Sequence, residues 1–267
     1  MAFIKSAPVA SRASSPEIII NKNGGSYILY DPSTQAWLAS ADITATESPI
    51  TIEKLFDAKF LKTQQLVDKI AQGRAETIFF SIDNTSLVLR HYHRGGLVAR
   101  LSSDCYLWLG LARTRAYREL AMLTSLSTSN LPAPKPFAIR VIHNGFYYRA
   151  DIITHALADT ETLSQQLQRG PVDHVVWREI GATIAKFHER GVYHADLNAH
   201  NILLNGNRQV FVIDFDKARF ENPGIDIWRQ QNLQRLYRSL VKLNKNSAAF
   251  YFSDHDWSQL KQGYCNS

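Results

Sequence analysis

The feature that most constrains the fold of this chain is a change in its apolar pattern near residue 154. Before that point, short β-type runs alternate with turn residues, as in ETIFFSI and SLVLRHYH, which are joined by Asp83-Asn84. Asn-Gly turns divide EIIINKNGGSYILYD and FAIRVIHNGFYYRADII in the same way. After that point, apolar residues recur mostly at helical spacing. The sequence therefore predicts an α+β fold that is strand-rich in its first half and helix-rich in its second.

Five segments are expected to be helical. TRAYRELAMLTSL ends before the prolines of LPAPKP, which cannot continue a helix. VDHVVWREIGATIAKFHERG closes at Gly191 in the position after the C-cap, and TETLSQQLQ begins with an N-cap threonine. IDIWRQQNLQRLYRSLVKL forms a further helix. The apolar spacing of IEKLFDAKFLKTQQLVDKIA, residues 52–71, predicts the fifth.

The composition limits the classes of protein to be considered. Hydrophobic residues make up 45% of the chain and charged residues 20%, which is typical of a globular protein. No run approaches the roughly 18 uninterrupted apolar residues that span a bilayer. Cys105 and Cys265 form neither a disulfide framework nor a zinc motif, and so few cysteines fit a reducing cytoplasm. The net charge of +6 favours a polyanionic partner, such as nucleic acid, an anionic lipid surface or a phosphorylated substrate.

The segment YHADLNAHNILL concentrates polar side chains. His194 and His200 do not have the i, i+4 spacing that places two imidazoles on one helix face, so a zinc site is not expected. Asp196 and Asn201 are followed by an apolar run, a turn and a second run that ends at Asp214. Phosphoryl transfer from a nucleotide needs such a set, because one carboxylate takes the proton of the attacking hydroxyl and oxygen ligands hold divalent cations.

The motif HADLNAHN…IDFD resembles the catalytic loop and metal-binding triplet of protein-kinase-like enzymes. Ala195 and Asp216 stand where eukaryotic protein kinases carry arginine and glycine. The resemblance implies a bilobal protein-kinase-like fold with ATP and Mg²⁺ as cofactors. It implies that Asp196 is the catalytic base and that Asn201 and Asp214 are metal ligands. The alternative is that these polar residues only cap a turn and end a surface strand.

On this interpretation the chain has three parts. Residues 1–16 are expected to form a mobile basic tail, residues 17–153 a nucleotide-binding N-lobe, and residues 154–267 a C-lobe with the catalytic loop and the acceptor site. The segment YYRADII, residues 147–153, is the candidate for the adenine-binding hinge, because strands give way to helices there.

A kinase-like site also needs a cation on a strand of the first half, paired with a helical glutamate. SLVLRHYH holds no lysine, but Val88 and Arg90 have the same parity and so point to one strand face. We expect Val88 to line the adenine and Arg90 to reach the phosphates, because arginine binds phosphate in a bidentate manner. Arg90 should then lie within a few ångströms of Glu119 or Asp214; the alternative for Arg90 and Glu119 is a solvated surface position. Four other cations lie on the preceding stretch, which is predicted to be helical, and are badly placed for a role on a strand: Lys54, Lys59, Lys62 and Lys69.

The phosphate-covering loop is expected in the segment AQGRAET. Gly73 and Arg74 lie there between a predicted helix and a predicted strand, where a glycine loop of a kinase-like fold belongs. Both residues are therefore candidates for nucleotide binding.

Further segments of the sequence resemble one group of kinase-like enzymes in particular. LVLRHYHRGGLVARLSSDCYLW, TRAYREL, LPAPKPFA, YYRADII and GVYHADLNAHNILLN…VFVIDFDKAR are similar to bacterial 3-deoxy-D-manno-octulosonic acid (Kdo) kinases of the lipopolysaccharide kinase group, over residues 73–238. This resemblance implies ATP-dependent phosphorylation of the 4-hydroxyl of a Kdo sugar on a lipid A precursor, in lipopolysaccharide core biosynthesis. It also implies peripheral residence on the cytoplasmic side of the cell inner membrane, at its anionic surface, with no nucleic acid and no obligate protein partner.

Such an acceptor is anionic, and eight arginines are candidates for docking it: Arg94, Arg100, Arg113, Arg115, Arg118, Arg229, Arg235 and Arg238. Two other classes of protein stay open. A small-molecule kinase of the aminoglycoside or choline type has a similar catalytic loop, although the Arg90 strand and HRGG argue against it. A non-catalytic kinase-like binding module would explain the missing strand lysine, but not the presence of Asp196, Asn201 and Asp214 together.

Overall fold

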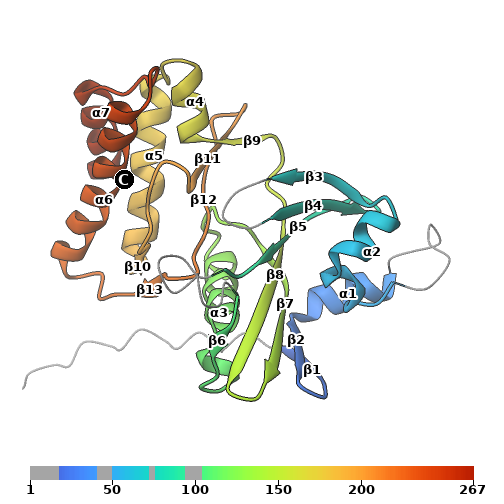
Figure 1. Cartoon of the computed structure of the whole chain (residues 1–267). Coiled ribbons are helices and arrows are strands. Elements are labelled where there is room, and N and C mark those ends of the chain that lie inside the picture. The colour runs from blue at the N-terminus through green and yellow to red at the C-terminus, as the bar shows by residue number, and fades with distance from the viewer. Residues whose placement is uncertain (1–17, 41–49, 72–75, 94–103) are drawn as a thin grey trace, which may run out of the picture.

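A computed structural model describes residues 18–40, 50–71, 76–93 and 104–267 of the 267-residue chain. An eight-stranded antiparallel sheet fills the first part, in the order β1-β2-β7-β8-β5-β4-β3, with β6 paired to β8 (Figure 1). The expected tail, residues 1–16, lies outside the described residues. The strands of this sheet are β1 (Ile19–Asn23), β2 (Ser26–Tyr30), β3 (Val67–Ala71), β4 (Thr77–Ile82), β5 (Thr85–His91), β6 (Tyr106–Leu107), β7 (Pro136–Asn144) and β8 (Tyr147–His155).

Three hairpins of this sheet lie where the turn residues predict them. Gly24, Asp83 and Gly145 lie in the turns β1–β2, β4–β5 and β7–β8 and have φ angles of 57°, 48° and 60°. These angles lie in the left-handed region, which glycine adopts freely and aspartate tolerates. The hairpin predictions are confirmed.

The alternation of side chains separates the two faces of the sheet. Leu29, Ile139 and Ile152 are cross-strand neighbours, and they pack in one core cluster with residues of α3 (Arg115–Thr128). Arg90 pairs with Ile152, so the register places Arg90 on this face. The opposite face packs against α1 (Pro32–Ser40), a 3-10 turn (Lys54–Phe56) and α2 (Ala58–Thr63).

The second part of the chain is mainly helical. Its helices are α4 (Leu163–Arg169), α5 (His174–Glu189), α6 (Asp226–Asn246) and α7 (Asp254–Cys265). β9 (Thr160–Thr162), β11 (Ile202–Asn205) and β12 (Val210–Val212) form a small sheet, and β10 (Val192–Tyr193) pairs with β13 (Arg219–Phe220). None of the helices in the described residues is long and apolar enough to cross a membrane.

Glycines position the helices around the site. Gly191, with a φ of 71°, follows the C-cap of α5 as the sequence predicts and turns the chain into β10. α5 and α7 pack backbone to backbone, because a Cβ at Gly181 or Gly263 would overlap a carbonyl oxygen of the other helix. α7 was not anticipated from the sequence, and its Trp257 and Leu260 are buried in the core.

Two expectations about the first part are wrong. The helix expected over residues 52–71 ends at Thr63, and its last residues form β3, so that Lys69 lies on a strand rather than a helix. The candidate hinge, residues 147–153, lies inside β8, where pairing with β5, β6 and β7 occupies its backbone. The division into lobes after residue 153 stays a prediction; the chain continues from β8 to β9 through residues 156–159.

Candidate active site

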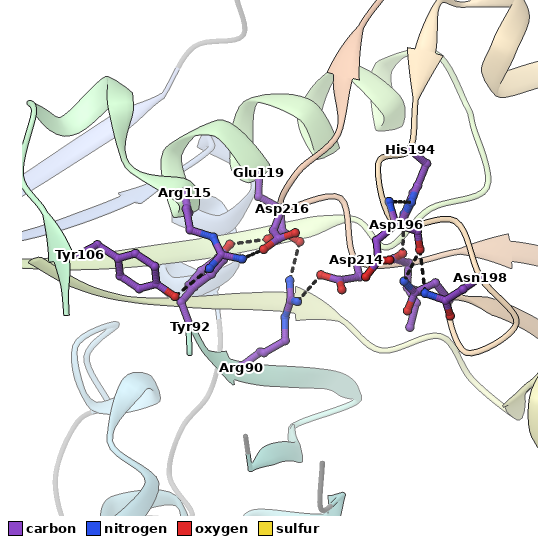
Figure 2. Close-up of polar contacts among 12 residues, drawn as sticks. Arg90, Tyr92, Tyr106, Arg115, Glu119, His194, Asp196, Asn198, Asp214 and Asp216 are labelled. Carbon is purple, nitrogen blue, oxygen red and sulfur yellow. Dashed lines mark hydrogen bonds and ion pairs between the residues drawn. The ribbon is translucent and has the colours of Figure 1, made fainter. Parts of the chain in front are cut away.

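The guanidinium of Arg90 contacts two carboxylates at the centre of the candidate site (Figure 2). Its Nη2 donates to Glu119 Oε1 at 2.5 Å, and its Nη1 donates to Asp214 Oδ1 at 2.6 Å. The three side chains come from β5, from α3 and from the segment after β12. Both neighbours expected for Arg90 from the sequence are therefore in contact with it.

Glu119 is the buried partner in this cluster, with only 2% of its side chain exposed. Its second carboxylate oxygen accepts a hydrogen bond from the Tyr92 hydroxyl at 2.5 Å. Burial raises the pKa of Glu119, and the Arg90 charge and the Tyr92 hydrogen bond act against this rise. Burial works against the charge on Arg90, but the carboxylates of Glu119 and Asp214 raise its pKa well above the ordinary value. The charges are thus compensated by direct contact, which a buried ion pair requires.

Asp214 has an unusual backbone that directs its side chain. Its φ is 68°, in the left-handed region that non-glycine residues seldom adopt, and such positions cluster at functional sites. The residue before it is anchored, because the Ile213 amide donates to the Asn201 carbonyl at 3.0 Å. The carboxylate that follows this anchor lies beside Arg90.

A second pair of arginine and aspartate lies next to the first. Arg115, the first residue of α3, pairs with Asp216 and donates to the Tyr106 hydroxyl at 2.7 Å (Figure 2). Its guanidinium also lies over the rings of Tyr92 and Tyr106. Arg115 had been a candidate for docking the acceptor, but the structure directs its charge inward to Asp216, whose side chain is 8% exposed.

The loop that carries Asp196 is held by hydrogen bonds to its backbone. His194 is buried, and its Nε2 donates to the Ile213 carbonyl at 2.9 Å while its Nδ1 accepts from the Asp196 amide at 3.2 Å. The side-chain amides of Asn198 and Asn201 both donate to the Asp196 carbonyl, at 2.8 Å and 2.9 Å. Burial lowers the pKa of His194, so a neutral ring joins this loop to the Asp214 segment.

A buried polar network attaches the same loop to the helices. Asn232 of α6 is 1% exposed; it donates to the His194 carbonyl at 2.7 Å and accepts from His188 Nε2 at 3.0 Å. His188 Nδ1 accepts in turn from the Tyr264 hydroxyl at 2.8 Å. Burial lowers the pKa of His188 to about 4. No sequence signal pointed to Asn232, which fixes α6 against the loop.

The carboxylate of Asp196 is paired with an arginine of α6. Arg235 Nη2 donates to Asp196 Oδ1 at 2.6 Å, and the two side chains are 44% and 38% exposed. Burial alone would raise the pKa of Asp196, but the hydrogen bond and charge of Arg235, with the charge of Lys217, hold it below the ordinary value. Asp196 is therefore ionised at neutral pH. The sequence makes Arg235 a candidate for docking the acceptor, and the structure places it beside Asp196.

The remaining candidates are placed as follows. Val88 lies on β5 between Phe79 and Thr154 of the neighbouring strands, two residues before Arg90. Gly73 and Arg74 lie outside the described residues, and so do the docking candidates Arg94 and Arg100. The segment that holds Gly73 joins two strands, β3 and β4, and not a helix and a strand as expected.

The donor set at the loop fits a divalent cation. Asn201 uses its amide nitrogen in the bond to the Asp196 carbonyl, which leaves its side-chain oxygen available to a cation. Asp214 uses only Oδ1 toward Arg90, so Oδ2 is its available oxygen. Hard cations such as Mg²⁺ prefer ligands of this type.

An α+β fold that brings a loop aspartate, an asparagine, a strand-end aspartate and a strand cation together is typical of a phosphotransferase of the kinase class. The chain belongs to the Lipopolysaccharide kinase (Kdo/WaaP) family, whose sequence model matches residues 58–264. The protein is therefore a kinase, and a kinase uses a nucleoside triphosphate.

Curated relatives are similar over most of their length. A 3-deoxy-D-manno-octulosonic acid kinase of Photobacterium profundum is 39% identical over 209 residues, which cover 78% of this chain and 87% of the relative. Proteins of the same name from Photobacterium damsela subsp. piscicida and Vibrio vulnificus are 35% and 34% identical over 236 and 241 residues. These alignments cover 88% and 90% of this chain, and 91% and 95% of the relatives. The family match runs past residue 238, the expected limit of the resemblance, and into α7.

Proposed function

We propose that this kinase transfers the terminal phosphoryl group of ATP to the 4-hydroxyl of a Kdo sugar on a lipid A precursor, in lipopolysaccharide core biosynthesis. The relatives named above support the choice of acceptor, because each is a 3-deoxy-D-manno-octulosonic acid kinase. The observation that carries the phosphoryl transfer is the double contact of Arg90 with Glu119 and Asp214. This contact puts a fixed cation beside a candidate metal ligand, which is the arrangement that stabilises a phosphoryl group in transfer.

Each residue of the site has a distinct task in this proposal. Asp196 holds the acceptor hydroxyl and takes its proton, and its low pKa keeps it ionised for that step. Asn201 and Asp214 hold Mg²⁺, and Arg90 contacts the phosphates while Glu119 fixes its position. When bound, Mg²⁺-ATP supplies the phosphoryl group together with the divalent charge that neutralises it. Val88, Gly73 and Arg74 are proposed to bind the nucleotide as well.

The proposed acceptor is a lipid of the inner membrane, whose cytoplasmic side is anionic. One end of the sheet has a surface that could bind to this side of the membrane. Four apolar side chains, each more than half exposed, form a hairpin-end patch at the β7–β8 turn: Leu107, Leu109, Phe146 and Tyr147. Leu107 and Tyr147 are cross-strand partners and point outward together, whereas the neighbouring pair Tyr106 and Tyr148 stacks inward. Figure 1 shows this turn at the end of the sheet away from the helices α4–α7.

Aromatic and basic side chains continue the hairpin-end patch. Trp108 stacks on Tyr27 with ring centroids 5.8 Å apart, and Lys22 Nζ lies 5.4 Å from the Tyr27 ring. Aromatic rings and lysines are the residues that proteins place at the headgroup level of a membrane, and anionic lipids attract the lysine charge. The patch therefore supports peripheral membrane binding.

Sedimentation with anionic vesicles tests this surface. Phe146→Asp should weaken binding roughly tenfold, because it removes the burial of one large apolar side chain and adds a repelled charge. Val175→Asp is the matched control, since Val175 is a half-exposed apolar residue on α5, away from the patch. Equal losses for both variants, or none for Phe146→Asp, would reject the patch as the membrane surface.

The catalytic proposal is tested by mass spectrometry of the acceptor after incubation with ATP and Mg²⁺. A Kdo-bearing lipid A precursor should gain the mass of one phosphate, whereas an aminoglycoside and choline presented in parallel should not. Phosphate on one of the small molecules instead would identify a small-molecule kinase. No consumption of ATP with any acceptor would indicate a non-catalytic binding module.

A further inference from the structure

Arg235 lies at the acceptor side of the candidate site, where its hydrogen bond and charge lower the pKa of Asp196. Its guanidinium donates to Asp196 Oδ1, the carboxylate that the acceptor hydroxyl must also contact. Any acceptor that hydrogen-bonds to Asp196 therefore meets Arg235 within the length of one sugar ring.

The fold holds Arg235 in this place through α6. Asn232, three residues earlier and on the same face of the helix, is fixed by hydrogen bonds to the His194 carbonyl and to His188. Leu236, the next residue, is fully buried. The helix is thus anchored on both sides of Arg235 in sequence, while the side chain itself is 44% exposed.

The contact with Asp196 uses one nitrogen of the guanidinium, Nη2. Arginine presents five N–H donors in a planar fork, so donors remain for a second anion. This fork matches the geometry of a carboxylate, which it binds with two parallel hydrogen bonds. The proposed contact with the nucleotide phosphates belongs to a different cation, Arg90, which is paired with Glu119 and Asp214 rather than with Asp196.

We propose that Arg235 binds the carboxylate of the acceptor sugar, and so selects an acidic sugar over a neutral one. The inference rests on the proposed function. A Kdo pyranose bears its carboxylate on C2, two ring atoms from the C4 that carries the reacting hydroxyl. When that hydroxyl contacts Asp196, the carboxylate lies beside Arg235. The carboxylate then shares the arginine with Asp196 and fixes the orientation of the ring.

The test combines two acceptors with two variants. The acceptors are the Kdo-bearing lipid A precursor and the same lipid with the Kdo carboxylate converted to a carboxamide, which keeps the shape and removes the charge. The variants are Arg235→Gln and, as a control, Lys242→Gln, which removes a positive charge from an exposed position two turns further along α6. Arg235→Lys keeps the charge but loses the fork. Thermal unfolding of each variant shows that it is folded.

With the unmodified enzyme, kcat/KM should be about 10- to 100-fold lower for the carboxamide than for the natural acceptor. This factor corresponds to the free energy of one charge-assisted hydrogen bond. Arg235→Gln should lose about as much on the natural acceptor and discriminate little between the two acceptors, with an unchanged KM for ATP. Arg235→Lys should restore part of the loss, and Lys242→Gln should behave as the unmodified enzyme.

Two results would overturn the proposal. Equal rates of the unmodified enzyme on both acceptors would show that the carboxylate is not bound. An Arg235→Gln variant that still discriminates fully, or that raises the KM for ATP instead, would assign Arg235 to another task. A different result, no phosphate on either lipid with the unmodified enzyme, would contradict the proposed function itself.

Discussion

The two sides of the candidate site are built differently. On the nucleotide side, Glu119 and Asp216 are nearly buried and each is matched by an arginine, Arg90 or Arg115. On the acceptor side, Asp196 and its partner Arg235 are each more than one-third exposed, and only the backbone around them is held by buried groups.

The nucleotide side is therefore prearranged, whereas the side chains of the acceptor side can adjust. Ion pairs that are already in contact on the nucleotide side cost no rearrangement when charge develops during transfer. The side chains on the acceptor side keep room to exchange partners, while His194, Asn198 and Asn201 fix where the Asp196 backbone lies.

Removal of the base should have the largest effect on turnover. Asp196→Asn keeps the size of the side chain but cannot take a proton, so turnover should fall on the order of 10²–10⁴-fold. Because the loop is held through its backbone, thermal stability should stay near that of the unmodified protein. Steady-state kinetics and thermal unfolding check the two parts, and an unchanged turnover would remove Asp196 from its assigned task.

Arg90 should affect the nucleotide more than the acceptor. Arg90→Ala leaves Glu119 buried without its cation, and the KM for ATP should rise about 10- to 100-fold with a fall in turnover. Arg90→Lys should recover part of the loss, because it restores the charge without the fork. Kinetics with each substrate varied in turn check this prediction. A variant that changes only the KM for the acceptor would show that Arg90 acts on the acceptor and not on the nucleotide.

The last expected effect is on stability in acid and leaves turnover at neutral pH unchanged. Folding lowers the pKa of His188 from 6.5 to about 4, so the unfolded chain binds a proton on this ring before the folded chain does. Stability is therefore lost as the pH falls through this window, by up to about 3 kcal/mol. Denaturant unfolding from pH 7 to 4 should show this slope in the unmodified protein and less of it in His188→Gln. His255→Gln, on the exposed surface of α7, should keep the full slope.

The parts of the fold that the sequence predicted depend on local signals. Paired strands around Asn-Gly turns and the glycine after α5 follow from neighbouring residues, and the strand face of Arg90 follows from its parity with Val88. The contacts of Arg90 with Glu119 and Asp214 were expected because the kinase-like motifs require a strand cation at that place.

The misses have a physical cause in non-local pairing. Leu66, Val67 and Ile70 have spacings that a helix also produces, and only the pairing of Val67–Ala71 with β4 makes this segment a strand. Asn232 and Arg235 lie 38 and 39 residues from their partners, on a helix whose periodicity does not say what its polar face contacts. The Arg115–Asp216 pair could not be predicted from the sequence either, because it joins α3 to a segment about a hundred residues later.

The most direct test of the assignment compares two carboxylates on the same short segment. Asp214 contacts Arg90 and is assigned to the metal, whereas Asp216, two residues on, is held by Arg115. Titration calorimetry of ATP into the unmodified protein, Asp214→Ala and Asp216→Ala, each with and without Mg²⁺, measures the difference. Asp214→Ala should lose the Mg²⁺-dependent part of ATP binding, and Asp216→Ala should keep most of it. Loss of this binding in Asp216→Ala, with retention in Asp214→Ala, would show that Asp216 and not Asp214 holds the metal.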